Sequence, residues 1–424
     1  MTTVVVGAGI TGLAAAVTLR GADRQVVVRE AADRAGGPVR TVRRDGWILE
    51  QGPQSIRGGA PEVGQLLELL RMRQRVVKAS PASSARFILS RGRLVKVGGS
   101  PRALSRLMRK RDVARMLLEP VIPRGGVPEE SVRDFVRRRI GEGAAEALLG
   151  PVIAGIYGGD PARIEASSGL SKIWRWEQEH GSLLRGAMAA PKATEPKGSF
   201  TFVHGMEELI DALAATAGPD LHLSDAVERI ERQGSGFRVH TAGGEQLAAD
   251  RMVLTCPPEV AGRLLPELSP PALPVARVVA LHLGYRTSDV GPAPQGFGWL
   301  AHRRELADVL GCLWVSSTFP SHAPPGTQLY RLMVGGARDP SAATRSDDEL
   351  IARARQVLAD VQGIRAEPVL VDVSRPAGIP QYPAGWGAFL ARARQLPGVA
   401  FAGWSWGGIG VADGITAAQG LTSA

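Results

Sequence analysis

The sequence is poor in cysteine, with only Cys256 and Cys312 among 424 residues. Two cysteines cannot build a disulfide framework, which excludes a small disulfide-rich secreted fold. Neither they nor the seven histidines show the spacing of metal ligands, so we expect no metal site and no catalytic triad. Both thiols are predicted to be buried as small apolar side chains in the reducing cytoplasm.

Long apolar runs are also missing. No stretch approaches the roughly 18 residues that a membrane-spanning helix requires. The N-terminus, MTTVVVGAGITG, enters a strand directly and has neither the basic start nor the cleavage site of a signal peptide. We therefore expect a cytoplasmic protein. An apolar content of 44% and a charged content of 22% are typical of an ordinary globular chain, and the length suggests two or three domains.

Charge of one sign is concentrated in a single segment. Residues 91–140 contain fourteen Lys or Arg and five Asp or Glu, which leaves nine of the ten net positive charges in this window. The rest of the chain is nearly neutral. No nucleic-acid-binding motif or interleaved aromatic residue accompanies the charge, so nucleic acid is not an expected partner.

A glycine-rich turn stands at the start of the chain. Residues 2–6 predict a buried strand, and a G-x-G-x-x-G motif separates it from an alanine-rich helix. In such a motif the first glycine makes the turn, the second lets a pyrophosphate approach the backbone, and the third lets the helix pack closely. The helix N-terminus then faces the phosphates. The turn residues predicted to contact a dinucleotide are Gly7, Ala8, Gly9, Ile10, Thr11 and Gly12.

An acidic residue ends the second predicted strand, RQVVVRE. Glu30 lies 23 residues after Gly7, where a carboxylate can accept hydrogen bonds from a ribose diol. A carboxylate there disfavours the 2′-phosphate of NADP, but it does not separate NAD from FAD. The loop that follows, with Arg34, Gly36, Gly37 and Pro38, offers charge and a further close backbone approach for an extended ligand.

The motif R-x-G-G-x-x-x-T in this loop resembles an element of FAD-dependent amine oxidases, phytoene desaturases and porphyrinogen oxidases. Later segments resemble porphyrinogen oxidases in particular and occur in the same order over nearly the whole chain. Gln54 stands where that family commonly has Asn, and Pro38 stands where relatives often have a bulkier residue. The segments are EQGPQS (50–55), RFILSRGRL (86–94), AGIYGGDP (154–161), WRWEQEHGSLLRGAM (174–188), GFGWL (296–300), GCLWVSSTFPSHAPPG (311–326), MVGGARDP (333–340), GIPQY (378–382) and GWSWGGIGVADGI (403–415).

This resemblance implies an α/β protein with a Rossmann-like FAD-binding domain, a mixed-sheet substrate domain and a helical insertion. It also implies an activity: oxidation of a porphyrinogen in haem biosynthesis, with O2 as acceptor and H2O2 as product. We favour protoporphyrinogen IX as substrate; coproporphyrinogen III is the alternative, and an amine oxidase or carotenoid desaturase is a more distant one. The flavin carries the redox step, so no side chain is expected to be catalytic.

The resemblance also assigns binding residues. Arg86 matches an arginine that pairs with a propionate, as a guanidinium can. Apolar residues at matching positions are expected to enclose the macrocycle, and Gly155 is expected to bring backbone close to it. The predicted substrate residues are Arg86, Gly155, Phe297, Leu300, Leu313 and Met333. The further predicted cofactor residues are Gly52, Pro53, Gln54, Ser55, Val227, Trp404, Ile409, Gly410 and Val411.

Three units are expected along the chain. A discontinuous FAD-binding domain comprises 1–75, 196–262 and 394–424, with a hairpin of strands 236–241 and 245–248 followed by a buried strand at 251–255. The substrate domain comprises 76–90 and 263–393, and includes an antiparallel sheet. Residues 91–195 form a helical domain, in which 101–118 show one apolar side and a helix start is expected at 128–130.

The basic charge of this helical domain has two interpretations. In the family that the sequence resembles, the region binds membranes, and each Lys or Arg near anionic lipid contributes on the order of 1 kcal/mol. Alternatively, the segment is a solvated, arginine-rich face. Docking of another enzyme of haem synthesis is a third use. The sequence does not predict an oligomeric state.

Overall fold

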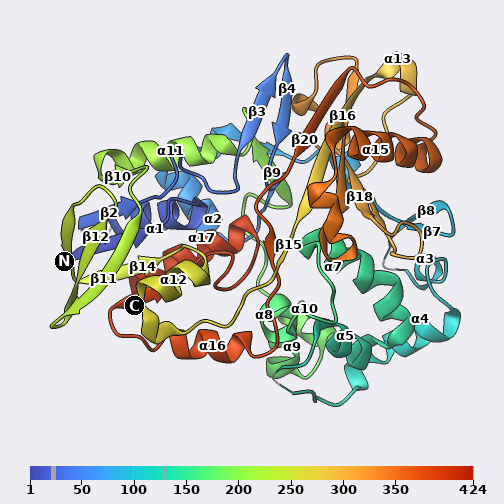
Figure 1. The fold of residues 1–424 in the computed structure, drawn as a ribbon. Helices are drawn as coiled ribbons and strands as arrows, with labels where there is room; N and C mark the ends of the chain where they lie inside the picture. Colours follow the sequence, from blue (N-terminus) through green and yellow to red (C-terminus); the bar gives the residue numbers. More distant parts are fainter. Residues whose placement is uncertain (21–24, 99, 128, 424) are drawn as a thin grey trace.

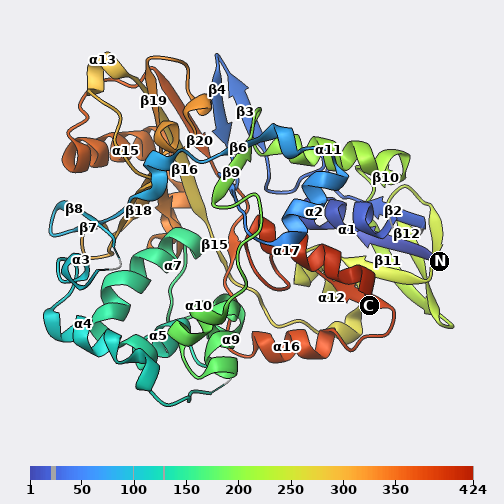
Figure 2. The same ribbon diagram turned by 180° about the vertical axis from the view of Figure 1, so that it is seen from behind.

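The computed structural model describes residues 1–20, 25–98, 100–127 and 129–423. Two sheets lie side by side, and a helical region lies below the second of them (Figure 1). The same chain passes repeatedly between the two sheets, which Figure 2 shows from behind. The predicted fold class, with a Rossmann-like domain, a mixed sheet and a helical insertion, is confirmed.

The first sheet is parallel throughout and is formed from distant parts of the chain. Its central strand β1 (Thr2–Val6) is a β-branched run that is buried on both faces. Val5 packs with helices on one face, and Val4 and Val6 pack on the other. The strand order is β10 (Leu221–His222), β2 (Gln25–Arg29), β1, β14 (Arg251–Leu254) and β22 (Val399–Phe401).

Helices and a small antiparallel sheet cover these two faces. Helix α1 (Ile10–Arg20) packs between α11 (Glu207–Ala217) and α17 (Val411–Gln419). The other face meets β11 (Val227–Gln233), β12 (Gly236–Thr241) and β13 (Gln246–Ala249), together with α16 (Trp386–Ala393). The predicted hairpin therefore exists, with its second strand at 246–249. Helices α2 (Pro61–Leu69) and α12 (Pro258–Leu264) complete this part.

The second sheet has seven strands and is antiparallel except where β17 meets β7. One of its faces is covered by α15 (Asp347–Gln362), whose Leu350, Ala354 and Leu358 are fully buried. The order is β20 (Leu370–Ser374), β16 (Val278–Arg286), β19 (Thr327–Gly335), β18 (Val309–Trp314), β17 (Gly298–Ala301), β7 (Arg86–Ser90) and β8 (Arg93–Lys96).

Short strands connect the two large sheets. The hairpin of β3 (Thr41–Arg44) and β4 (Trp47–Glu50) leads from the first sheet towards the second. A three-stranded sheet joins β5 (Ile56–Arg57), β9 (Ser199–Phe202) and β6 (Val76–Lys78). A two-stranded pair, β15 (Val275–Ala276) and β21 (Ile379–Pro380), completes the connection.

The helical region begins after β8, not at residue 91. Strand β8 pairs with β7, so the expectation that residues from 91 onward are helical is wrong for 93–96. The region contains α3 (Pro101–Leu104), α4 (Lys110–Leu117), α5 (Val132–Ile140), α6 (Glu142–Ala144), α7 (Gly150–Tyr157), α8 (Ala166–Gly169), α9 (Ser171–His180) and α10 (Leu183–Ala189).

Two local predictions in this region are corrected. The single apolar side expected over 101–118 is interrupted, because α3 ends at Leu104 and a turn precedes α4. The turn changes the phase of the second helix, so Val113 is buried there whereas Leu118 is exposed. The next helix begins at Val132, and its N-cap is Ser131, whose hydroxyl accepts a hydrogen bond from the Asp134 N–H (3.1 Å). Pro128, in the predicted start, lies outside the described residues.

Within the described ranges, none of the helices combines the length and the apolar character that crossing a membrane would require.

Candidate functional site

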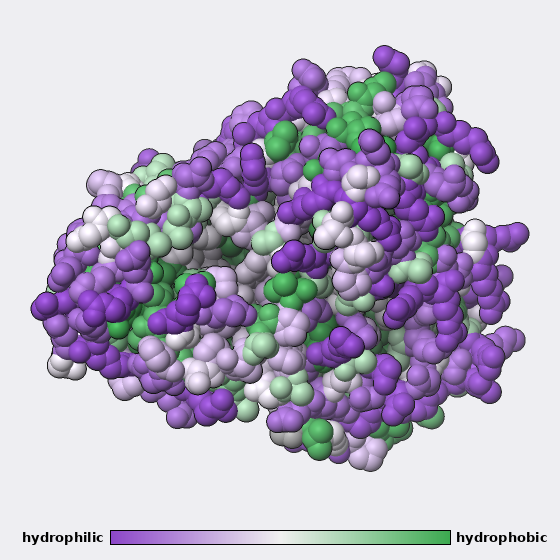
Figure 3. Space-filling model, viewed as in Figure 1, coloured by the Kyte–Doolittle hydropathy of each residue, from purple (hydrophilic) through white to green (hydrophobic). Residues whose placement is uncertain are grey.

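A cavity of about 700 Å³ lies between the two large sheets. Its lining includes the carboxyl ends of the parallel strands at one end and residues of β16, β18 and β19 at the other. The space-filling view shows pale and apolar residues in the hollow between the two sheets, whereas the outer surface is mostly hydrophilic (Figure 3). One continuous cavity therefore joins the predicted dinucleotide site to the predicted substrate region.

The glycine turn at this cavity has the shape that a dinucleotide requires. A Cβ atom on Gly12 would lie 1.9 Å from the Gly7 carbonyl oxygen, so helix α1 can approach the strand only without a side chain there. A Cβ atom on Gly9 would meet nothing within 4 Å, and Gly9 lines the cavity. The space over Gly9 and the free N–H groups at the start of α1 fit a pyrophosphate. Ile10 and Thr11 also line the cavity, whereas Ala8 is fully buried.

Glu30 stands at the end of β2 and lines the same cavity. Its carboxylate accepts hydrogen bonds from the N–H groups of Ala8 (2.6 Å) and Ala32 (2.9 Å). The Asp225 N–H donates to the Glu30 carbonyl (2.9 Å), which places Val227, at the start of β11, beside this end of the cavity. These positions suit an adenosine group.

The loop after β2 is held against the glycine turn. The N–H of Gly36 donates to the Ala8 carbonyl (2.8 Å), and Gly37 and Pro38 line the cavity. The Arg34 guanidinium instead hydrogen-bonds to carbonyl groups of its own loop, those of Ala35 (3.0 Å) and Gly37. Arg34 and Gly36 therefore shape the loop from outside the cavity lining.

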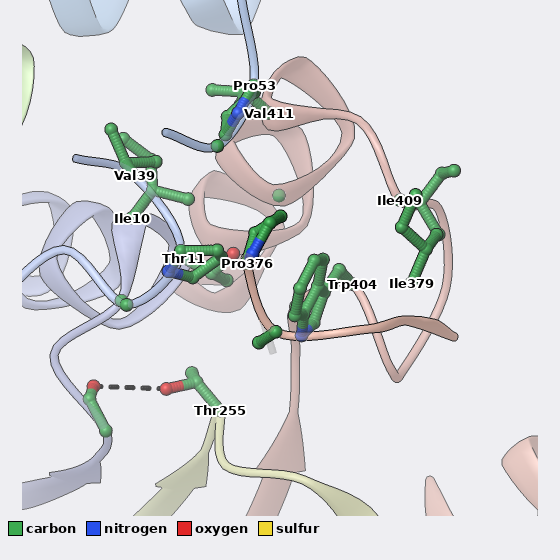
Figure 4. Close-up of a pocket in the computed structure, with 18 of the residues that line it drawn as sticks. Ile10, Thr11, Val39, Pro53, Thr255, Pro376, Ile379, Trp404, Ile409 and Val411 are labelled. Carbon is green, nitrogen blue, oxygen red and sulfur yellow. Dashed lines mark hydrogen bonds between the residues drawn. The ribbon is translucent and has the colours of Figure 1, made fainter. Parts of the chain in front are cut away.

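Two segments from opposite ends of the chain meet at the middle of the cavity. Gly52, Pro53 and Gln54 line one side, whereas Ser55 does not. A second side is formed by Trp404, Ile409, Gly410 and Val411, which lead into α17. Figure 4 shows Pro53 beside Val411, with Trp404 and Pro376 below them. An isoalloxazine ring placed here would meet the N-terminus of a helix, whose dipole favours negative charge.

The far end of the cavity is one face of the seven-stranded sheet. Directly paired residues place Arg331, Leu313 and Arg86 in one row, with Gly298 between the last two. The neighbouring row of the same face contains Ala280, Met333, Gly311, Leu300 and Ile88. Hence strand register alone brings four predicted substrate residues, Arg86, Leu300, Leu313 and Met333, onto one face.

Not all of the predicted substrate residues line the cavity. Leu313, Met333 and Gly155 line it. Leu300 lies against Gly155, where a Cβ atom would come within 2.5 Å of a Leu300 methyl carbon. Arg86 is exposed, and its guanidinium lies 5.1 Å from the centre of the Phe297 ring, just outside the lining residues. These roles remain predictions.

The structure adds lining residues that the sequence reasoning missed. Thr255 and Cys256 follow β14, and the Thr255 hydroxyl donates to the carbonyl groups of Val6 (2.9 Å) and Gly7 (3.1 Å). Figure 4 draws one hydrogen bond of the Thr255 side chain. Because ligands bind beyond the carboxyl ends of parallel strands, the predicted strand at 251–255 could have indicated them. Arg331 was also missed, although it lies two residues from Met333 and therefore on the same face of a strand.

Burial sets the charge states behind the turn at Gly52–Gln54. It lowers the pKa of His282 and of His322 to about 4, so both imidazoles are neutral at pH 7. Nδ1 of His282 lies 3.3 Å from the Asp372 carboxylate, and Nδ1 of His322 lies 3.5 Å from the Gln54 amide nitrogen. Burial also raises the pKa of Glu50 to about 7, against hydrogen bonds from Met206 and Thr41 that lower it.

Comparison with known proteins places the chain among flavoenzymes. The family model described as flavin containing amine oxidoreductase matches residues 10–420. A chloroplastic protoporphyrinogen oxidase of Nicotiana tabacum is 30% identical over 90% of this chain and 76% of its own length. A coproporphyrinogen III oxidase of Propionibacterium freudenreichii subsp. freudenreichii is 30% identical over 98% of this chain and 89% of its own length.

A solved structure agrees over the full length. A protein of Exiguobacterium sp. 255-15, provisionally named a protoporphyrinogen oxidase, superposes with a TM-score of 0.81 at 25% identity. The alignment covers 100% of this chain and 98% of that protein. The observed arrangement of two sheets and a helical region is therefore shared with it.

Proposed function

Because the chain belongs to the family of flavin containing amine oxidoreductases, whose members bind FAD, we propose that it is an oxygen-dependent protoporphyrinogen oxidase of haem biosynthesis. In this proposal it converts protoporphyrinogen IX to protoporphyrin IX. The observation that supports it most directly is the single cavity that joins the dinucleotide cradle to an apolar sheet face. Bound FAD supplies the oxidation in three two-electron rounds, each of which ends with O2 reduced to H2O2.

In our proposal the residues of this chain bind and orient both FAD and the substrate. The turn at Gly9 and the start of α1 hold the pyrophosphate, while Glu30 holds the ribose. The start of α17 faces the isoalloxazine and favours the negative charge that develops there. Leu313 and Met333 contact the macrocycle on the sheet side, where apolar walls exclude water from the reacting carbon.

The distribution of cations favours a substrate with few acid groups. The arginines that line the described part of the cavity are Arg29, Arg263 and Arg331. Arg29 pairs with Asp225 and with Glu245 (2.6 Å), and Arg263 belongs to the end near Glu30. Arg331 donates to Gly52 and Gln54, so the exposed Arg86 is the guanidinium left for an acid group on the substrate face. So few cations suit the two propionates of protoporphyrinogen IX better than the four of coproporphyrinogen III.

Coproporphyrinogen III is the second candidate, because oxidases of both substrates match this chain at similar identity. The coproporphyrinogen III oxidase of Propionibacterium freudenreichii and the chloroplastic protoporphyrinogen oxidase of tobacco are both 30% identical to it. Coverage is also similar, at 95% of the Bacillus subtilis coproporphyrinogen III oxidase and 92% of the mitochondrial protoporphyrinogen oxidase of tobacco. The four propionates of coproporphyrinogen III would require cations beyond those that line the cavity.

The experiment is a paired assay in air. The purified protein is first scanned for the visible absorbance of bound flavin, and porphyrin fluorescence is then followed with each porphyrinogen at equal concentration. We expect the larger kcat/KM with protoporphyrinogen IX, together with H2O2 formation. A larger kcat/KM with coproporphyrinogen III would instead make coproporphyrinogen III the proposed substrate. Bound flavin with no fluorescence increase from either substrate would refute the proposal.

A division into three functional units accompanies this proposal, with FAD held by 1–75, 196–262 and 394–424 and substrate by 76–90 and 263–393.

For the helical unit, 91–195, we propose contact with the surface of an anionic membrane. Three apolar side chains within its basic segment are exposed: Leu117 (60% exposed), Leu118 (53%) and Val121 (69%). They support membrane contact over a purely solvated face. Co-sedimentation with anionic vesicles, but not with neutral vesicles, is expected; equal recovery in both pellets would reject it.

A further inference from the structure

Arg331 is a buried arginine on the cavity wall that contacts no carboxylate of the described chain. It belongs to β19 and is 7% exposed. One terminal nitrogen donates to the Gly52 carbonyl (2.7 Å), and the other donates to the Gln54 side-chain oxygen (3.3 Å). Its Nε atom is buried without a hydrogen-bond partner among the described residues. The guanidinium therefore holds both ends of the Gly52–Gln54 turn through neutral acceptors.

The groups around Arg331 do not neutralise its charge by contact. His282 pairs with it across β16 and β19, and His322 reaches it through Gln54; both are neutral at pH 7. Asp372 attracts it from a distance while accepting hydrogen bonds from Gln51 (2.9 Å) and His282. Glu50 also attracts it from a distance.

Despite burial, this cation persists at neutral pH. Burial lowers the pKa of Arg331 to about 10, so the guanidinium remains protonated at pH 7. A buried charge without a contacting counter-ion costs stability. Such an arrangement is expected where the charge acts on a ligand. In the proposed placement of FAD, the nearest ligand group is the isoalloxazine ring, between the turn that Arg331 holds and the start of α17.

We propose that Arg331 is a positioning residue with an electrostatic role towards the flavin, an inference that rests on the proposed placement of FAD in this cavity. Its hydrogen bonds fix the Gly52–Gln54 turn against the ring. Its charge and the α17 dipole together stabilise the negative charge that reduction leaves on bound FAD. The reduction potential of bound FAD is thereby raised, which favours electron uptake from the substrate.

The test compares two substitutions that differ in charge. Arg331→Gln is neutral and keeps a donor for the Gly52 carbonyl, whereas Arg331→Lys keeps the charge. The potential of bound FAD is measured in each purified holoprotein by anaerobic reductive titration against a reference dye. We expect the Lys variant to stay close to the wild type. In the Gln variant the two-electron reduction constant should fall about tenfold, which corresponds to about 30 mV.

Equal potentials in the Gln and Lys variants would overturn the electrostatic role. An unchanged potential in both would also remove the positioning role. Arg86→Ala serves as the control, because the exposed Arg86 guanidinium is on the same sheet face but outside the cavity lining. The reduction potential of FAD bound to this variant should equal that of the wild type. The potential is read without any porphyrinogen. A failure of the substrate proposal therefore remains distinguishable from a failure of this one.

Discussion

Two buried arginines show how differently two regions of this molecule treat charge. Arg139, on α5 of the helical region, is fully buried and pairs with Glu119 and with Glu177 (3.2 Å). It also donates to the carbonyl groups of Ile122 (3.0 Å) and Gly181 (3.0 Å). Among the described residues, Arg331 on the cavity wall has two neutral acceptors, and its Nε atom has no hydrogen-bond partner.

The difference separates structural charge from functional charge. Around Arg139 the protein supplies its own counter-ions. Burial would raise the pKa of Glu119, but hydrogen bonds from Arg139, Leu183 and Ser182 lower it on balance. That network is complete without a ligand and joins segments that are far apart in the chain. Arg331 lines the cavity, and among the described residues it has neutral acceptors and no contacting carboxylate.

The largest expected effect tests this contrast through stability. Arg139→Met should cost about 3–5 kcal/mol, because it leaves the buried Glu119 carboxylate without its cation. Arg331→Met should cost only about 1–3 kcal/mol, because it leaves neutral acceptors unpaired. Limited proteolysis within the helical region and urea unfolding of the whole protein measure the two effects. Equal losses would mean that the two arginines are equivalent structural charges.

The second prediction compares two glycines of the same turn. Gly9→Val should weaken FAD binding about 100-fold, or about 2.7 kcal/mol, because the new side chain projects into open cavity. The fold should survive. The matched variant Gly12→Val places a Cβ atom against the Gly7 carbonyl, so it should reduce folded protein as well as flavin content.

Flavin absorbance per folded protein measures the flavin content of the two variants, and circular dichroism measures how much of each variant is folded. Normal flavin content in Gly9→Val would show that the space over Gly9 is not the pyrophosphate site. Identical loss of structure in both variants would show that the turn serves folding alone.

Much of the fold could be predicted because it depends on local pattern. The β-branched run at Thr2–Val6, the three glycines and the strand that ends before Glu30 specify the parallel sheet without reference to distant residues. The helical region was harder to predict from the sequence. The break between Leu104 and Lys110 depends on tertiary packing, which overrides the periodicity of a short apolar stretch. Strand β8 likewise exists because β7 is there to pair with it.

The site could be predicted only in part for a related reason. Family-like segments indicated Leu313 and Met333, but they carry no information on enclosure, and Arg86 lies outside the cavity lining. Arg331 was missed because an arginine in an apolar strand is informative only when its partners are known. Its acceptors, Gly52 and Gln54, lie more than 270 residues away in the chain.

The third prediction concerns the exposed cation on the same sheet face. Arg86 makes no hydrogen bond or ion pair with another described side chain and stacks on Phe297. Loss of one charged hydrogen bond to a propionate should cost about 1.5–3 kcal/mol. Arg86→Ala should therefore raise KM for protoporphyrinogen IX about 10- to 100-fold, with flavin content and stability unchanged. An unaltered KM would place the acid arm elsewhere.

The smallest expected effect is the pH dependence of stability near the cavity. The unfolded chain protonates His282 and His322 near pH 6.5, whereas the folded protein excludes those protons until about pH 4. The free energy of unfolding therefore falls as the pH falls through this range. Glu50 acts in the opposite direction, because its folded pKa of about 7 lies above its ordinary value of 4.5.

From pH 6.5 to 5.5 the destabilising contribution of the two histidines exceeds the stabilising contribution of Glu50. The free energy of unfolding should therefore fall by about 1 kcal/mol. Glu50→Gln removes the opposing contribution, so the loss over the same unit should become about 2 kcal/mol. Thermal unfolding of both proteins at the two pH values measures the difference. A Glu50→Gln variant with the wild-type slope would mean that Glu50 is ionised in the folded protein. Arg331 would then have a nearby permanent negative charge, and the contrast with Arg139 would be reduced.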